Sequence, residues 1–247
     1  MSDTRDEILA QIFDPSLGFF KRNNQQEVLS ICPSYKDVEN LANLLSSDPR
    51  EEDLQQFLED YPQFLLGLCG RGWDSSLAFI TKPSVGTSYK ADFGILTYGQ
   101  GGCRIYLIEI KRSSENVYNQ SGAPAKKLQE ALTQIKNREI WLTTKVNILT
   151  FTDDILGYAK NLPQYPERSQ NKSFRRYSSE YIEDSWSRFG GYNRPIIEHY
   201  IIIGRWAKMS KDHQKKLIYH NQENKHCILT YDQVARRGFD RPSFLPP

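Results

Sequence analysis

The most regular hydrophobic pattern lies in the middle of the chain. Residues 93–98 and 103–110 are two runs rich in β-branched, aliphatic and aromatic side chains, and a glycine cluster at 99–102 separates them. Two such runs around a short glycine-rich turn predict an antiparallel β-hairpin. The second run is nearly continuous in its apolar character, which is typical of a strand covered on both faces.

The remaining periodicity predicts further helices and strands on both sides of this hairpin. Helices are expected at 4–13, 38–45, 49–61, 124–142, 181–189, 210–222 and from Thr230 through Arg237. Strands are expected at 77–82, 146–151, 196–203 and 227–230, with loops at 84–90 and 162–176. Because a full helix separates the hairpin from 146–151, that strand is expected in a βαβ-like relation to it.

These elements predict an α/β protein with a mixed central sheet, an antiparallel hairpin and helices on both faces. A short helical extension is expected at 1–46, the main domain at 47–240 and a loose tail at 241–247. The two small amphipathic helices of the extension are expected to pack on their own domain, with a dimer contact as the alternative.

Capping residues refine two helix starts. Asp48 is expected to be the N-cap of the helix that follows, with Pro49 as its first residue and Glu51 as the capping-box acid. Asp232 is expected to be the N-cap of the last helix.

Composition narrows the class of protein. The net charge is only +2, so it does not by itself indicate a nucleic-acid partner, but the basic residues concentrate from Lys160 onward. The four cysteines are far apart in the sequence, which favours free thiols in a reducing cytoplasm over zinc ligands or disulfides. No apolar run is long enough to span a bilayer, so a cytoplasmic protein without membrane contact is expected.

The candidate chemistry lies at one end of the hairpin. If Tyr98 pairs with Cys103, counting along the ladder sets Asp92 opposite Glu109, and Lys111 shares their face. Two adjacent carboxylates repel each other unless a cation lies between them. Lys111 can be that cation in a structural cluster at the sheet edge. Alternatively, the carboxylates bind Mg²⁺ and Lys111 orients or deprotonates a water molecule.

These residues also carry a family resemblance. The sequence Lys-Ala-Asp-Phe, a short hairpin and then Leu-Ile-Glu-Ile-Lys resembles the core of PD-(D/E)XK nucleases, with Ala91 in place of the usual proline. The order of segments over roughly residues 50–237 resembles the nuclease domain of Shedu-type anti-phage defence proteins. The supporting segments are 54–65, 128–135, 201–205 and 228–234.

The resemblance implies a restriction-endonuclease-like fold and assigns roles to particular residues. Asp92 and Glu109 would hold Mg²⁺, for which Mn²⁺ would substitute, together with the main-chain carbonyl of Ile110. Lys111 would position the attacking water, and Gln134 would support Lys111 or that water. An acid on the first helix of the domain, Glu51 or Glu52, would assist the metal; a plain capping role for Glu51 is the alternative.

The expected function is therefore a Mg²⁺-dependent DNA endonuclease, acting on phage or other foreign DNA as a homo-oligomer, a dimer or a tetramer. Basic and aromatic residues are also expected to contact the nucleic acid, namely Lys90, Arg112, Tyr118, Arg175 and Arg176. A merely solvated basic surface is equally compatible with the sequence. The alternatives are a non-cleaving module that binds DNA ends or branched DNA and needs a partner for catalysis, and a nuclease that acts on RNA.

Overall fold

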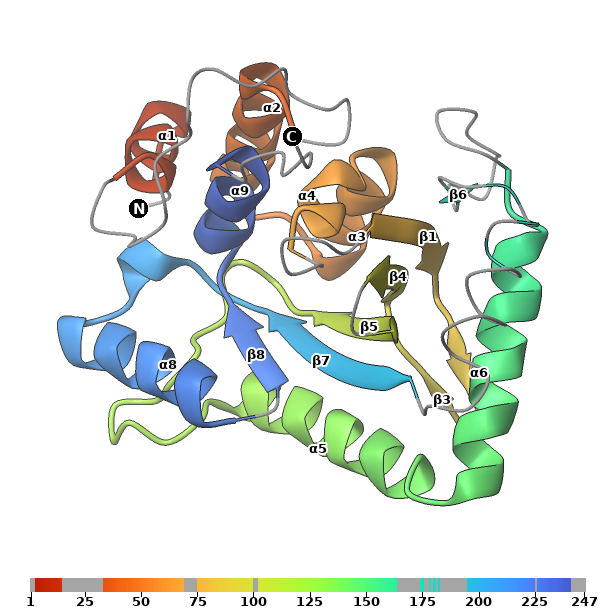
Figure 1. The fold of residues 1–247 in the computed structure, drawn as a ribbon. Helices are drawn as coiled ribbons and strands as arrows, with labels where there is room; N and C mark the ends of the chain where they lie inside the picture. Colours follow the sequence, from red (N-terminus) through yellow and green to blue (C-terminus); the bar gives the residue numbers. More distant parts are fainter. Residues whose placement is uncertain are drawn as a thin grey trace. The chain divides into compact units, whose positions relative to one another are not determined.

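The computed structural model describes residues 3–14, 33–68, 75–99, 102–163, 174–175, 178, 180, 182, 195–224 and 226–240. The chain forms two compact units, each assembled from segments that are distant in the sequence. The first unit contains Met1–Leu68, Ile110–Leu128 and Ile201–Pro247, and the second contains Cys69–Glu109 and Gln129–Tyr200. Figure 1 labels the helices and strands along the chain.

The main sheet has the strand order β6-β1-β4-β5-β7-β8. Its strands are β1 (Ser75–Thr81), β4 (Phe93–Gly99), β5 (Gly102–Ile110), β6 (Phe174–Arg175), β7 (Ile196–Ile202) and β8 (His226–Leu229). β4 pairs antiparallel with both β1 and β5. Just past β5, Lys111 N donates to Ile202 O at 2.8 Å and Gly204 N donates to Arg112 O at 3.2 Å, a pattern of two chains running in the same direction. The sheet is therefore mixed, and the predicted α/β class is confirmed.

The predicted hairpin is present as β4 and β5. Tyr98 pairs with Cys103 as expected, and the ladder continues to Phe93 opposite Ile108. Phe93 also stacks on Phe79 of β1, with ring centroids 5.5 Å apart. In β5 residues 105–110 are all buried, so this strand is covered on both faces, as its continuous apolar run predicted.

The strand expected at 146–151 is wrong, because this segment lies in α6 (Lys145–Lys160). Thr144 caps the helix by accepting from Asn147 N at 3.3 Å. Val146 and Leu149 are 72% and 46% exposed, so the apolar run was not a strand face. The buried residues recur at helical spacing through the whole segment and are Ile148, Phe151, Thr152, Ile155, Leu156 and Ala159.

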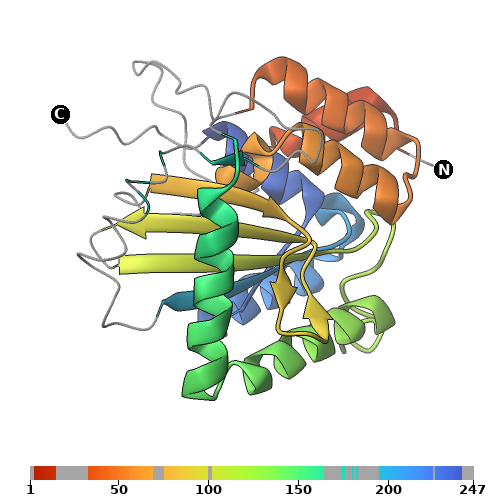
Figure 2. The same ribbon diagram turned by 90° about the vertical axis from the view of Figure 1, so that its right-hand side faces the viewer.

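This helix covers one face of the sheet in the second unit. The buried cluster it forms includes Ala78 and Ile80 of β1, Leu96 of β4, and Ile105 and Leu107 of β5. Figure 2 shows α6 lying across strands β1, β4 and β5. The apolar periodicity of α6 thus serves a helix-on-sheet layer, the usual arrangement of an α/β core.

The segment 84–90, expected to be a loop, forms a second small hairpin of β2 (Ser84–Val85) and β3 (Tyr89–Lys90). Gly86 opens its turn with a φ of +67°, and a Cβ there would lie 2.6 Å from the Trp141 ring. Only glycine both adopts this positive φ without strain and leaves room for the Trp141 ring, so this turn requires glycine at position 86.

The helix expected after Pro124 is α5 (Lys126–Trp141). Its buried positions are Leu128, Ala131, Ile135 and Arg138, and Leu142 follows just beyond its end. The spacing of three and four residues marks one face of the helix. Four of these five residues are apolar as predicted, and the fifth is an arginine.

The first unit is mainly helical. It contains α1 (Arg5–Ile12), α2 (Tyr35–Ser46), α3 (Glu51–Asp60), α4 (Gln63–Leu66), the 3₁₀ helix η2 (Trp206–Lys208), α8 (Lys211–Glu223) and α9 (Tyr231–Asp240). Capping boxes begin α1 at Thr4 and α2 at Ser34. Both helices pack against each other and against α9, so the two N-terminal helices dock on the C-terminal helix of their own chain, as expected.

Two cap predictions are wrong by two residues. Asp48 has a φ of +50° and is not a cap; the N-cap of α3 is Arg50, whose N–H donates to Asp53 at 3.0 Å. Three consecutive acids, Glu51, Glu52 and Asp53, made the position of the capping acid ambiguous in the sequence.

The cap of α9 is also different. Thr230 N donates to Gln233 Oε1 at 3.0 Å and Gln233 N donates to the Thr230 hydroxyl at 3.4 Å, a reciprocal capping box. Asp232 is instead fully buried and accepts from Arg205 Nε at 2.7 Å and Trp206 N at 2.6 Å. Burial raises the pKa of the Asp232 carboxyl, and the Arg205 guanidinium opposes this rise.

Several predictions fall outside the described residues. These are most of the loop at 162–176, the helix at 181–189, Arg176 and the tail at 241–247. In the part of the chain that the structure describes, no helix has both the length and the apolar character needed to cross a bilayer.

Candidate functional site

In the second unit, the two predicted acids stand at the same end of the hairpin. Regular pairing stops at Phe93 opposite Ile108, and Asp92 and Glu109 are the next residues outward on the two strands. Asp92 N donates to Ile108 O at 3.1 Å, one residue short of a regular pair with Glu109. The Glu109 residue is only 3% exposed, whereas Asp92 is partly exposed. A carboxylate as buried as Glu109 needs a charged or hydrogen-bonding partner.

That partner is Arg138 of α5. Arg138 Nη1 donates to Glu109 Oε1, and the two side chains are 1% and 5% exposed. Arg138 Nη1 also donates to the main-chain carbonyl of Lys90, at 2.8 Å. Sequence reasoning missed Arg138, although the signal was present as a charged residue in the apolar stripe of α5.

Gln134 lies one turn before Arg138 on α5, off the buried stripe, and its side chain is exposed. On this helix the structure therefore places Arg138 inside the unit and Gln134 at its surface. The role expected for Gln134 stays a prediction.

In the first unit, the main chain of Lys111 is held on both sides. Its N–H donates to Ile202 O at 2.8 Å, and its carbonyl accepts from the hydroxyl of buried Tyr231 at 2.9 Å. Its ammonium lies 3.4 Å from Glu51 Oε1, and the Lys111 residue is 8% exposed. The backbone of this lysine is thus fixed by segments that are distant in the sequence.

Glu51 is the first residue of α3, and its carboxylate pairs with Lys111. The capping acid of α3 is Asp53, so the predicted capping role of Glu51 is wrong. Glu52 is exposed. A metal-assisting role for either residue stays a prediction.

The residues expected at a nucleic acid differ in their surroundings. Arg112 pairs with Asp48 at 3.4 Å, with both side chains partly solvated. Lys90 is exposed at the end of β3. Arg175 donates from Nη1 to the carbonyl of Lys160, the last residue of α6, which gives it a helix-capping contact. These contacts leave the nucleic-acid roles as predictions.

Tyr118 is 6% exposed, and its ring is already covered. The His213 ring lies 5.4 Å from it and Lys216 Nζ lies 5.3 Å from its centroid. Burial raises the pKa of the Tyr118 hydroxyl. A base can stack on this ring only if the covering side chains move.

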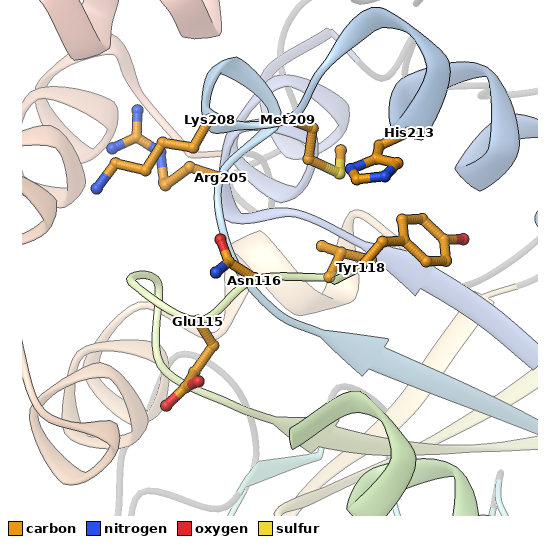
Figure 3. A pocket seen from close by; sticks show the side chains of 8 residues that line it. Glu115, Asn116, Tyr118, Arg205, Lys208, Met209 and His213 are labelled. Atoms are coloured by element: carbon orange, nitrogen blue, oxygen red, sulfur yellow. The ribbon is translucent and has the colours of Figure 1, made fainter. Parts of the chain in front are cut away.

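Tyr118 also lines a small pocket of the first unit, with Glu115, Asn116, Val117, Arg205, Lys208, Met209 and His213. Figure 3 shows Arg205 and Lys208 on one side of it and Tyr118 and His213 on the other. The space is about 20 Å³, enough for roughly one water molecule. The pocket therefore does not hold a nucleotide.

The donors in the second unit fit a magnesium ion in kind. Mg²⁺ prefers oxygen ligands, often one or two carboxylates with several waters. Asp92 and Glu109 supply two carboxylates from one end of one hairpin. No group of three or more His, Cys, Asp or Glu side chains among the described residues is arranged to hold a metal, so main-chain oxygens or waters would have to complete the coordination.

These features define an α/β protein whose central hairpin carries two acids at one end and a Glu-x-Lys sequence, which is consistent with a restriction-endonuclease-like fold. Residues 48–234 match the family model described as Shedu protein SduA, C-terminal. This match covers more than half of the chain, so the chain belongs to the Shedu family, the anti-phage defence family that its motifs resemble. A search of curated proteins finds no match.

Proposed function

We propose that this protein is a Mg²⁺-dependent DNA endonuclease that hydrolyses phosphodiester bonds of phage or other foreign DNA. The observation that carries the proposal is the buried Glu109, one residue past the regular ladder and at the same end of the hairpin as Asp92. A carboxylate buried at a strand end is costly to maintain, and functional sites are where proteins retain such groups.

The chemistry follows from the residue types. Asp92, Glu109 and the Ile110 carbonyl would hold the ion, with Mn²⁺ able to replace Mg²⁺. When bound, the ion would offset negative charge on the phosphate undergoing attack. Lys111 would orient the attacking water and neutralise part of the same charge, and its fixed backbone supports such a role. Gln134 would support Lys111 or the water.

The proposed assembly is a homo-oligomer, a dimer or a tetramer. In-line hydrolysis at one site cuts one strand, so cleavage of both strands requires two sites or two encounters. Arg112 and Lys90, which are partly or fully exposed, are the described basic residues proposed to contact the DNA backbone. Arg176, which the sequence also suggests for this role, lies outside the described residues.

The test is cleavage of supercoiled and linear DNA with Mg²⁺ or Mn²⁺, for wild type and for Asp92→Asn, Glu109→Gln and Lys111→Ala. Each variant should lose at least about 10²-fold in rate, because the two acids would hold the ion and Lys111 would stabilise charge that develops on the phosphate. Glu198→Gln is the matched control, since Glu198 is also a paired carboxylate of the second unit, bonded to Arg104 at 2.8 Å. Cleavage by Glu109→Gln at the wild-type rate would remove Glu109 from the mechanism.

One observation favours the second candidate, a non-cleaving module that binds DNA ends or branched DNA. Glu109 and Lys111 are each paired within their own unit, with Arg138 and Glu51 respectively. Such pairs also occur in purely structural clusters. Binding of DNA that is equally strong in wild type and Glu109→Gln, with no cutting of DNA or RNA by either, would establish this candidate.

A further inference from the structure

Arg138 occupies a place in the second unit that packing alone does not explain. It stands in the buried stripe of α5 between Ile135 and Leu142, where an apolar residue continues the pattern. Its side chain is 1% exposed. Burying a guanidinium is expensive unless it is paired and hydrogen-bonded, so its contacts must compensate.

One nitrogen of this guanidinium makes both described contacts. Nη1 carries two hydrogens, and it donates to Glu109 Oε1 and to the carbonyl of Lys90. Lys90 is two residues before Asp92 in the chain. Arg138 therefore ties α5 to the carboxylate of β5 and to the main chain that leads into the other acid.

The remaining nitrogens of Arg138 point to the same conclusion. Nε and Nη2 are buried and make no hydrogen bond within the described part of the molecule. Buried donors without a partner are rare in folded proteins and require an explanation, for which a place beside reacting groups is one. A guanidinium selected only for stability would be expected to use its whole fork on acceptors.

We propose that Arg138 is a positioning residue of the candidate active site. It holds the Glu109 carboxylate in one orientation, and it fixes the chain entering Asp92, so that both acids are in place before a metal ion binds. This inference rests on the proposed function and adds to it a residue from a helix that the hairpin motif does not include. Groups that orient metal ligands typically contribute 10- to 100-fold to metal affinity.

A second ion pair on the same strand supplies the comparison. Arg104 of β5 lies 2.8 Å from Glu198, and both side chains are 16% exposed. It is also an arginine–glutamate pair of the second unit, but Arg104 pairs across from Thr97, far along the ladder from Phe93. Loss of Arg104 therefore removes a salt bridge without touching either acid of the candidate site.

The experiment measures Mn²⁺ binding to the full chain without nucleic acid, by isothermal titration calorimetry. The proteins are wild type, Glu109→Gln, Arg138→Met, Arg138→Lys and Arg104→Met, each first checked for folding by circular dichroism in EDTA. Glu109→Gln should abolish binding at the site. Arg138→Met should weaken it at least about tenfold, and Arg138→Lys, which keeps the charge, about threefold. Arg104→Met should bind as wild type does.

The outcomes separate this inference from the proposed function. Wild type that binds no Mn²⁺, or binds it as well after Glu109→Gln, would overturn the metal site and this inference with it. Binding that depends on Glu109 but is unchanged in folded Arg138→Met would overturn the positioning role alone. If Arg138→Met does not fold, Arg138→Lys decides: wild-type affinity would refute the role, and a loss that Arg104→Met does not share would support it.

Discussion

The stability of the Arg138–Glu109 pair can be predicted separately from its metal-linked role. Replacing Arg138 by methionine leaves Glu109, whose side chain is 5% exposed, without its cation in the interior. Removing one partner of such a buried pair costs about 3–5 kcal/mol. The same substitution at Arg104 removes the cation that pairs with Glu198. Because the Glu198 side chain is 16% exposed, solvent reduces the cost to about 1–2 kcal/mol.

The assay is urea denaturation in EDTA, followed by circular dichroism and fluorescence. With a slope of about 2 kcal/mol/M, Arg138→Met should lower the midpoint by roughly 1.5–2.5 M and Arg104→Met by less than about 1 M. Both arginines belong to the second unit, so the two variants report on the same part of the molecule. A protein of ordinary stability unfolds at urea concentrations that allow both shifts to be measured, although Arg138→Met will retain little of its free energy of unfolding.

A double-mutant cycle completes the test. Glu109→Gln together with Arg138→Met removes both charges, so the double variant should be at least about 2 kcal/mol more stable than the sum of the single losses implies. A coupling free energy near zero, or a smaller loss for Arg138→Met than for Arg104→Met, would refute the claim that the Arg138–Glu109 pair stabilises the second unit.

Three further predictions concern other parts of the molecule. Asp232→Asn should destabilise the protein by about 3–5 kcal/mol in urea melts, because buried Arg205 loses its carboxylate, and an unchanged midpoint would contradict this. Gly204→Ala should cost about 1–3 kcal/mol, since the φ of +68° is strained for alanine and its Cβ would lie 2.6 Å from Glu115 O; a thermal melt equal to wild type would show that the turn adapts. Burial raises the pKa of Cys103 to about 12, so at pH 8 its thiol stays protonated, and mass spectrometry after iodoacetamide treatment should find it modified only once urea is added.

The sequence predicted the hairpin well because its information is local. A glycine cluster between two β-rich runs fixes both the turn and the register, and the pairing of Tyr98 with Cys103 then sets every residue outward to Phe93. Asp92 departs from the regular ladder because its N–H bonds to Ile108, a feature that register counting does not contain.

The sequence predicts a strand in place of part of α6 because the segment considered, 146–151, is too short to show the helical period. Over 146–151 the apolar residues fit a buried strand, and only the continuation through Ile155 and Ala159 reveals the helical period. Arg138 was missed for a different reason. Arg138 stands where the helical spacing predicts a buried apolar residue, but arginine is usually found at the surface. Its burial is explained only by the carboxylate of Glu109, which lies 29 positions away in the sequence.

The anchoring of Lys111 has a consequence for the order in which the protein becomes complete during synthesis. The hydroxyl that holds its carbonyl belongs to Tyr231, 120 residues later in the chain. At about 5–20 residues per second, a ribosome needs roughly 6–24 s to reach that tyrosine after making the lysine. Throughout this interval the nascent chain lacks the hydrogen bond from Tyr231 to the carbonyl of its predicted catalytic lysine, so the site is expected to be fully assembled only after Tyr231 has been made.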